Sequence, residues 1–291
     1  MGYKSKRVEP FDIINYILLG ILTFIIIYPF YYIVINSFNG MLTHRPSFLW
    51  PELPTVRTYQ TVFKDDSLML AFGVSVARTV LGTLITVTGT SLCAYALSKP
   101  YLRLRNLYMS LLIIPTFFNG GTIPVYLNLK MLGLVDTFWI YVIPHVFSFF
   151  YMVVLMSAFK AVPASLEEAA LIDGAGCWRV FVQIVFPVTV PTFATIALYA
   201  AVGQWNEWYD TMYYTNNENL QTLASVLMRI VRENLGADME DMLSDAVDNN
   251  AYNPDGVKFA TMVVAVTPIL FVYPFLQKYF VKGIMIGSIK G

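Results

Sequence analysis

The sequence predicts an all-α polytopic membrane protein with six transmembrane helices and a polar helical elbow between two of them. Apolar residues make up 57% of the 291 residues and charged residues only 13%. The mean hydropathy of +0.59 is typical of polytopic membrane proteins. One polar segment that contains glycine, residues 165–191, separates two long apolar runs. The net charge is zero, which gives no electrostatic support for a nucleic-acid partner.

Six apolar stretches are suited to cross a bilayer, which takes about 17–25 helical residues. The first is uncharged and too long for the core of a signal peptide, so we expect it to be retained. The stretches are 13–38, 69–98, 106–126, 137–158, 188–204 and 257–276. We divide the chain into an N-terminal tail, first span and outer loop (1–68), a membrane-spanning core (69–278) that contains an acidic outer insert (214–256), and a C-terminal tail (279–291).

The second expected span, residues 69–98, is rich in glycine, serine and threonine. Small residues let helices pack closely in a membrane, so we expect this helix to be buried in the bundle. Arg78 lies within it, and facing lipid would cost roughly 2.5 kcal/mol or more. Arg78 therefore either snorkels to the interface or lines a pathway.

The third and fourth expected spans carry polar or helix-breaking residues. The stretch PTFFNGGTIPVYL interrupts the third span, and broken backbone at membrane depth is tolerated where it lines a cavity. This stretch, with Asn119 and Tyr126, either lines a pathway or forms a kink for packing. His145 lies in the fourth span. A lone histidine there is more often a hydrogen-bonded packing residue than a ligand or a proton relay.

The polar segment 165–191 predicts a helix, a turn and a second helix. Ser165 and Glu168 have the spacing of a capping box, and Gly174 suits the left-handed turn that ends a helix. A second helical pattern follows from Trp178, and we expect Pro187 and Pro191 to change its course. The segment therefore predicts an elbow exposed to water.

This elbow resembles the EAA loop of ABC importer permeases. Glu168-Ala169-Ala170, Gly174, Ile184 and Pro187 keep the family spacing, and Phe186 stands where the pattern has leucine. In that family the elbow is a cytoplasmic coupling helix that docks in a groove of the ATPase subunit. The alternative is an amphipathic helix that lies on the membrane. The resemblance implies that the ATPase-coupling residues are Glu167, Glu168, Ala169, Ala170, Asp173, Gly174 and Arg179.

The fifth expected span ends in the cluster QWNEWYD. Aromatic faces beside amides and carboxylates suit a sugar ring, and the same composition is typical of a membrane interface. A glycan-acting enzyme would use Glu207 and Asp210, one helical turn apart, but nothing else assembles a site around them, so we assign no catalytic residue. The candidate substrate-pathway residues are Arg78, Asn119, Tyr126, Trp205, Asn206, Trp208 and Asp210.

Lysine and arginine are more frequent in the loops on the side of both termini and the elbow. The positive-inside rule therefore places both termini and the elbow in the cytoplasm of a prokaryotic cell, whose plasma or inner membrane the chain crosses. The acidic insert then lies outside, where we expect it to contact a partner protein. Cys93 and Cys177 are too few for a disulfide framework or a zinc site, and we expect free thiols in helices.

Several segments together resemble the carbohydrate-uptake permeases related to MalG, and within them the LplC/YtcP-like oligosaccharide permeases. These segments are the elbow, GGTIPVYLNLKMLGLVDTFW, QWNEWYD and the ending KGIMIGSIKG, and the resemblance covers residues 12–291. It implies a type I ABC importer permease that pairs with a second, homologous permease and with two ATPase domains. An extracytoplasmic solute-binding protein would deliver an oligosaccharide.

The chain has no GxxxxGK[ST] phosphate-binding loop. We therefore expect ATP and magnesium to bind to the partner ATPase, and this chain to be a permease without enzyme activity, cofactor or metal. One alternative is an ABC permease for a non-sugar solute. Another is an ion-coupled secondary transporter, for which Arg78 and His145 are the only deep ionisable residues and no carboxylate lies within a span.

Overall fold

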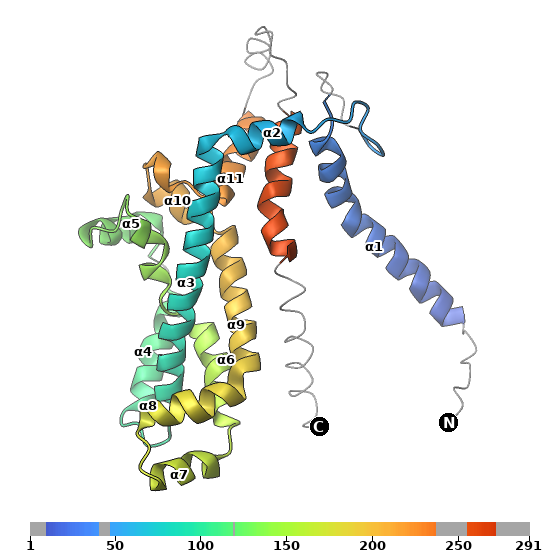
Figure 1. The fold of residues 1–291 in the computed structure, drawn as a ribbon. Helices are drawn as coiled ribbons and strands as arrows, with labels where there is room; N and C mark the ends of the chain where they lie inside the picture. The colour runs from blue at the N-terminus through green and yellow to red at the C-terminus, as the bar shows by residue number, and fades with distance from the viewer. Residues whose placement is uncertain (1–9, 41–46, 119, 237–254, 272–291) are drawn as a thin grey trace. The chain divides into compact units, whose positions relative to one another are not determined.

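The computed structural model describes residues 10–40, 47–118, 120–236 and 255–271, and every regular element among them is a helix (Figure 1). The predicted all-α class is confirmed for this part of the chain. The chain divides into two compact units, which are described separately. The first unit comprises Met1–Asp65 and Glu233–Val266, and the second comprises Asp66–Arg232 and Thr267–Gly291.

The first unit contains α1 (Pro10–Ser37) and α2 (Arg57–Lys64). The most apolar window of α1 has a mean hydropathy of 2.3 and no buried residue. A helix that is apolar on all sides and exposed is suited to lipid. At its end, the Asn36 amide donates to the Ser47 carbonyl and accepts from the Ser47 amide, both at 2.9 Å. These bonds fix the loop that follows the helix.

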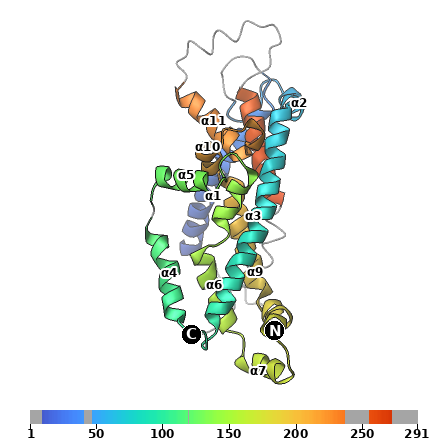
Figure 2. The ribbon, with the colours of Figure 1, turned by 90° about the vertical axis from the view of Figure 1, so that its left-hand side faces the viewer.

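The centre of the second unit is α3 (Asp66–Ser98), which packs along α6 (Phe149–Lys160) and α9 (Phe186–Asn206) (Figures 1 and 2). Its buried residues recur every three or four positions and form one stripe. The prediction of a buried helix therefore holds for this stripe, whereas Val80 and Leu84 on other faces of α3 are exposed. The stripe consists of Ala71, Ser75, Arg78, Gly82, Thr86, Thr90, Ala94 and Leu97.

The third expected span is not one helix. It consists of α4 (Arg105–Phe117) and α5 (Thr122–Met131), and α5 lies across the direction of α4 (Figure 2). Gly121 lies between them with a φ of +86°, a conformation that L-residues rarely adopt. The interruption was predicted from the glycines and prolines. Asn119 lies outside the described residues.

The fourth expected span is also broken, and this break was not predicted. Two short 3-10 turns, η1 (Phe138–Tyr141) and η2 (Ile143–His145), precede α6, and the two parts differ in direction by 48°. Pro144 has no amide hydrogen to donate within a helix. Ser148 then starts α6, and its hydroxyl accepts from the Tyr151 amide. A single helix over residues 137–158 is therefore wrong.

Three described helices are long and apolar enough to cross a membrane, and the bent pair makes a fourth. The three are α1, α3 and the continuous helix Cys177–Asn206. Within the described part of the chain, residues 255–271 form a further helix that covers most of the sixth expected span. The count of six spans remains a prediction.

The elbow consists of α7 (Ala164–Ile172), a turn, and α8 (Cys177–Val180). Gly174 ends α7 with a φ of +83°, and the Ala175 amide donates to the Ala170 carbonyl at 2.9 Å, as predicted for a left-handed helix end. The predicted capping box is wrong. Pro163 is the residue before the helix, and its fixed φ starts the helix ahead of Ser165 without a capping side chain.

The second arm of the elbow runs directly into the fifth span. A π-helical turn, η3 (Phe181–Val185), joins α8 to α9, so that helical backbone continues from Cys177 to Asn206. Pro187 follows the π-helical turn by two residues, and Pro191 lies inside α9 without ending it. The fifth span therefore begins earlier than the predicted Val188.

The acidic insert is described only in part. Its first helical stretch forms α11 (Leu223–Gly236), as the periodicity predicted. Residues 237–254 lie outside the described residues. Both cysteines lie in helices and are free thiols, as predicted.

Candidate functional site

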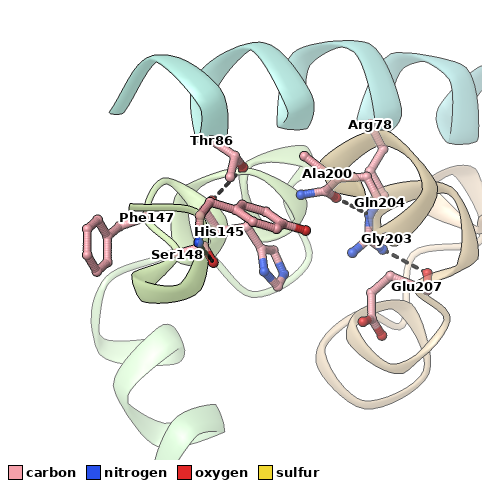
Figure 3. A pocket seen from close by; sticks show the side chains of 10 residues that line it. Arg78, Thr86, His145, Phe147, Ser148, Ala200, Gly203, Gln204 and Glu207 are labelled. Atoms are coloured by element: carbon pink, nitrogen blue, oxygen red, sulfur yellow. Dashed lines mark hydrogen bonds between the residues drawn. The ribbon is translucent and has the colours of Figure 1, made fainter. Parts of the chain in front are cut away.

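A charged cluster lies where α3, α9 and α10 (Tyr209–Tyr214) meet. Arg78 of α3 is fully buried, with 0% of its surface exposed. Its guanidinium donates to three acceptors: Gln204 Oε1 at 3.0 Å, the Glu207 main-chain oxygen at 3.1 Å and Asp210 Oδ2 at 2.6 Å. Figure 3 shows the first two of these bonds. Arg78 therefore does not snorkel; its charge is held inside the bundle.

The same carboxylate of Asp210 has a second partner. His145 Nε2 lies 2.8 Å from Asp210 Oδ2, and the Tyr141 ring lies under the guanidinium, 4.6 Å from Arg78 Cζ. Burial raises the pKa of Asp210, but the hydrogen bonds and charges of His145 and Arg78 outweigh it and hold that pKa below its ordinary value. Asp210 is therefore ionised and pairs with Arg78.

A cavity of about 220 Å³ opens beside this cluster (Figure 3). It lies where the fourth span is broken. The Thr86 hydroxyl donates to the His145 carbonyl at 2.6 Å, and the Ser148 amide donates to Thr90 Oγ1 at 3.2 Å, so α3 satisfies backbone groups that the break frees. The lining residues are Arg78, Thr86, His145, Phe147, Ser148, Tyr151, Ala200, Gly203, Gln204 and Glu207.

Gly82 makes room for the Gln204 side chain. A Cβ atom at Gly82 would lie 2.7 Å from Gln204 Cδ and 2.8 Å from Gln204 Nε2. Gln204 is buried and accepts from Arg78, so any larger residue at Gly82 displaces this amide from the guanidinium. The small residue predicted for close helix packing therefore also shapes the charged cluster.

The structure brings together only two of the described pathway candidates, Arg78 and Asp210. Tyr126 stacks on Tyr214 with ring centres 6.5 Å apart, and Trp205 is buried against Phe72. The Trp208 ring lies under the Arg232 guanidinium, at 5.6 Å. Asn206 is exposed and its amide donates to its own helix.

Of the cavity residues only Arg78 was in the predicted site; His145 and Gln204 are the ones whose polar side chains contact the charged cluster, and they were missing from it. His145 was expected to be a hydrogen-bonded packing residue, and its ring lies within hydrogen-bond distance of Asp210. The signal that was available in the sequence is Pro144 next to His145, followed by Ser148, a good helix N-cap. Together they indicate a break in the fourth span that carries polar groups.

The predicted coupling residues form the exposed surface of the elbow. Glu168, Ala169, Asp173, Gly174 and Arg179 are exposed. Among them lie large apolar side chains, with Ile172 85% and Trp178 66% exposed. An apolar patch rimmed by charges is typical of a protein–protein contact surface.

Glu167 is different, because it faces the protein. Its carboxylate forms an ion pair with Lys99 at the end of α3, and Lys99 is 8% exposed. Lys99 Nζ also lies 4.3 Å from the centre of the Tyr95 ring, and that ring packs against Phe181, with ring centres 4.7 Å apart. The end of α3 therefore contacts both arms of the elbow.

Long apolar helices with a charged cluster buried among them define a helical membrane protein. The chain belongs to the family described as the binding-protein-dependent transport system inner membrane component, which it matches over residues 1–286. It is 38% identical over 291 residues to Protein LplC of Bacillus subtilis (strain 168), covering 99% of this chain and 98% of that protein.

Two further proteins are similar over nearly the whole chain. One is the polygalacturonan/rhamnogalacturonan transport system permease protein YtcP of Bacillus subtilis (strain 168), 34% identical over 283 residues and covering 97% of this chain and 98% of that protein. The other is a chain in the crystal structure of a bacterial ABC transporter involved in the import of the acidic polysaccharide alginate. It matches with a TM-score of 0.86 and 30% identity, covering 96% of this chain and all of that one. The predicted resemblance to LplC/YtcP-like permeases is confirmed.

Proposed function

We propose that this chain is a transmembrane permease subunit of an ATP-driven ABC importer that moves an oligosaccharide into the cytoplasm. The family describes an inner-membrane transport component, and the names of the similar proteins support a sugar as the substrate. The observation that carries the proposal is the elbow, whose exposed charged and apolar residues form a docking surface joined to α3 through Lys99 and Glu167.

The partners follow from this arrangement. Two ATPase domains bind ATP and magnesium, and one of them docks on the elbow. A second, homologous permease completes the pathway, and an extracytoplasmic binding protein delivers the sugar. The termini and the elbow lie in the cytoplasm in this proposal, as the lysine and arginine distribution predicts.

The mechanism uses the contacts between the elbow and α3. Closure of the ATPase domains moves α7, and the Lys99–Glu167 pair passes that movement to the end of α3. The helix α3 packs along α6 and α9 (Figure 1). Arg78 lies in the N-terminal half of α3, whereas Lys99 directly follows its C-terminal end. A rigid-body tilt of these helices then alternates the access of the pathway, with nucleotide and the loaded binding protein biasing the two states.

The coupling role of the elbow is tested with two substitutions. Gly174→Pro removes a left-handed glycine and Glu168→Arg reverses an exposed charge, so both disturb the docking surface. We expect both to lower the ATP hydrolysis stimulated by loaded binding protein at least tenfold in the reconstituted complex, while membrane insertion is unchanged. Glu52→Arg, which reverses an exposed charge outside the elbow sequence, is the control. Stimulated hydrolysis at the wild-type rate in both variants overturns the coupling assignment.

The ion-coupled alternative is not favoured. We expected no carboxylate within a span; Asp210 lies in α10, after the fifth span, and contacts both Arg78 and His145. An ion-coupled carrier needs a carboxylate that exchanges its proton near neutral pH. The pKa of Asp210 is lowered rather than raised, because Arg78 and His145 stabilise its charged form. Asp210 therefore acts as the fixed partner of a permanent cation.

A further inference from the structure

We propose that the cavity beside Arg78 is a subsite for one uncharged sugar ring, and that it makes this subunit selective for neutral over uronic glycans. The inference rests on the proposed function, which names an oligosaccharide but not its charge. It concerns residues of α3, α9 and the broken fourth span that face one space (Figure 3).

The volume of the cavity admits a single ring. It measures about 220 Å³, below the roughly 300–1,000 Å³ of sites that enclose a drug-sized ligand. It corresponds to roughly seven water molecules at about 30 Å³ each. An oligosaccharide therefore places one residue in the cavity at a time, while the rest of its chain extends along the pathway.

The lining suits the hydroxyl fringe and the C–H faces of such a ring. The His145 side chain is 38% exposed there, and Ser148, Tyr151 and Gln204 add groups that both donate and accept hydrogen bonds. Phe147 and Tyr151 add aromatic surface. A water-filled cavity with these groups exchanges its hydrogen bonds for those of sugar hydroxyls.

The charges in the cavity disfavour a carboxylate. The guanidinium of Arg78 is already committed to Asp210, Gln204 and the Glu207 main chain, and His145 Nε2 is directed at Asp210. The Glu207 carboxylate points away from Arg78 in Figure 3 and forms no ion pair among the described residues; it accepts from the Tyr209 amide at 2.9 Å. The carboxylate of an incoming uronate would therefore be repelled by Glu207. To pair with Arg78 it would have to displace Asp210.

Two proteins of similar sequence carry names that refer to acidic glycans. YtcP is named for polygalacturonan and rhamnogalacturonan, and the similar solved structure is of a transporter for acidic alginate. A preference of this chain for uronic glycans is therefore the outcome that would overturn the inference.

The test measures binding to the purified complex of both permeases and the ATPase, without the binding protein, so that only the permease selects. The probes are a neutral trisaccharide and a uronic trisaccharide of matched linkage, measured by calorimetry. We expect the neutral probe to bind at least tenfold tighter. In Glu207→Lys the ratio should shift at least tenfold toward the uronic probe, whereas Glu218→Lys, an exposed charge change outside the cavity, should leave it unchanged.

A second variant tests the location. Gly203 lines the cavity, and a Cβ atom there meets nothing within 4 Å, so Gly203→Leu fills the space without a clash at the backbone. We expect at least tenfold weaker binding of the neutral probe, with an unchanged melting temperature. Equal or tighter binding of the uronic probe, an unchanged ratio in Glu207→Lys, or unchanged binding in Gly203→Leu would overturn the inference. The importer proposal is judged separately, by ATP hydrolysis with loaded binding protein.

Discussion

Removal of the charge on Asp210 should strongly destabilise the protein. Arg78 has no exposed surface and its ion pair with Asp210 is 2.6 Å long, so Asp210→Asn leaves a buried cation without its anion. Breaking one partner of a buried pair typically costs about 3–5 kcal/mol. With about 2–4 °C of melting temperature per kcal/mol for domains of this size, the expected decrease is roughly 6–20 °C.

The double variant Arg78→Met/Asp210→Asn measures the interaction between Arg78 and Asp210 apart from the other contacts of each residue. It removes both charges, so it should be more stable than the sum of the two single variants predicts, by about 2 kcal/mol or more. Some loss remains, because Gln204 and the Glu207 carbonyl lose their donor, at about 1–3 kcal/mol for each buried group.

Unfolding can be followed in detergent with a dye that reacts with thiols. Cys177 is exposed and is replaced by serine in every variant, so that the partly buried Cys93 of α3 reports the opening of the bundle. A decrease of less than about 2 °C in Asp210→Asn, or strict additivity in the double variant, would refute the view that this is a desolvated pair.

Three further results are expected. Lys99→Met and Glu167→Gln should each lower the amount of sugar transported per ATP hydrolysed, because α3 loses its ion pair with the elbow. The exchange Lys99→Glu/Glu167→Lys should restore part of this transport. A loss in the exchange as large as in the single variants would contradict the coupling role of the pair. Gly82→Ala should lower the melting temperature by the equivalent of about 1–3 kcal/mol through a displaced buried amide, whereas Gly73→Ala, with open space around it, should be neutral or stabilising. The stability advantage of the wild type over Asp210→Asn should be complete above the ordinary aspartate pKa of 3.8. It should shrink as the pH falls through the lowered pKa that Asp210 has in the folded protein. A stability advantage that grows as the pH falls would contradict this.

Local patterns predicted the parts of the fold that depend on local chemistry. The small residues of 69–98 predicted a buried helix, and α3 buries one stripe on which many of these side chains lie. Gly174 predicted the end of α7, since its positive φ suits glycine. The capping box at Ser165 was wrong because Pro163 fixes where the helix starts.

The central cluster depends on contacts that no local pattern contains. Arg78 and Asp210 are 132 positions apart in the sequence, and His145 is 65 positions from Asp210. Arg78, His145 and Asp210 were each noted in the sequence. The contact of Arg78 with Asp210 requires the packing of α3 against α9, and the contact of His145 with Asp210 requires the break at Pro144. Neither the packing partner nor the direction of a broken span follows from hydropathy.

The most direct test of the proposed function is ATP hydrolysis by the full complex in proteoliposomes. The complex contains this chain, the second permease, the ATPase and the binding protein, and oligosaccharides and non-sugar solutes are added one at a time. We expect stimulation by one class of oligosaccharide, and loss of that stimulation in Gly174→Pro. If a peptide or another non-sugar solute stimulated hydrolysis and no oligosaccharide did, the result would contradict the assignment of a carbohydrate substrate.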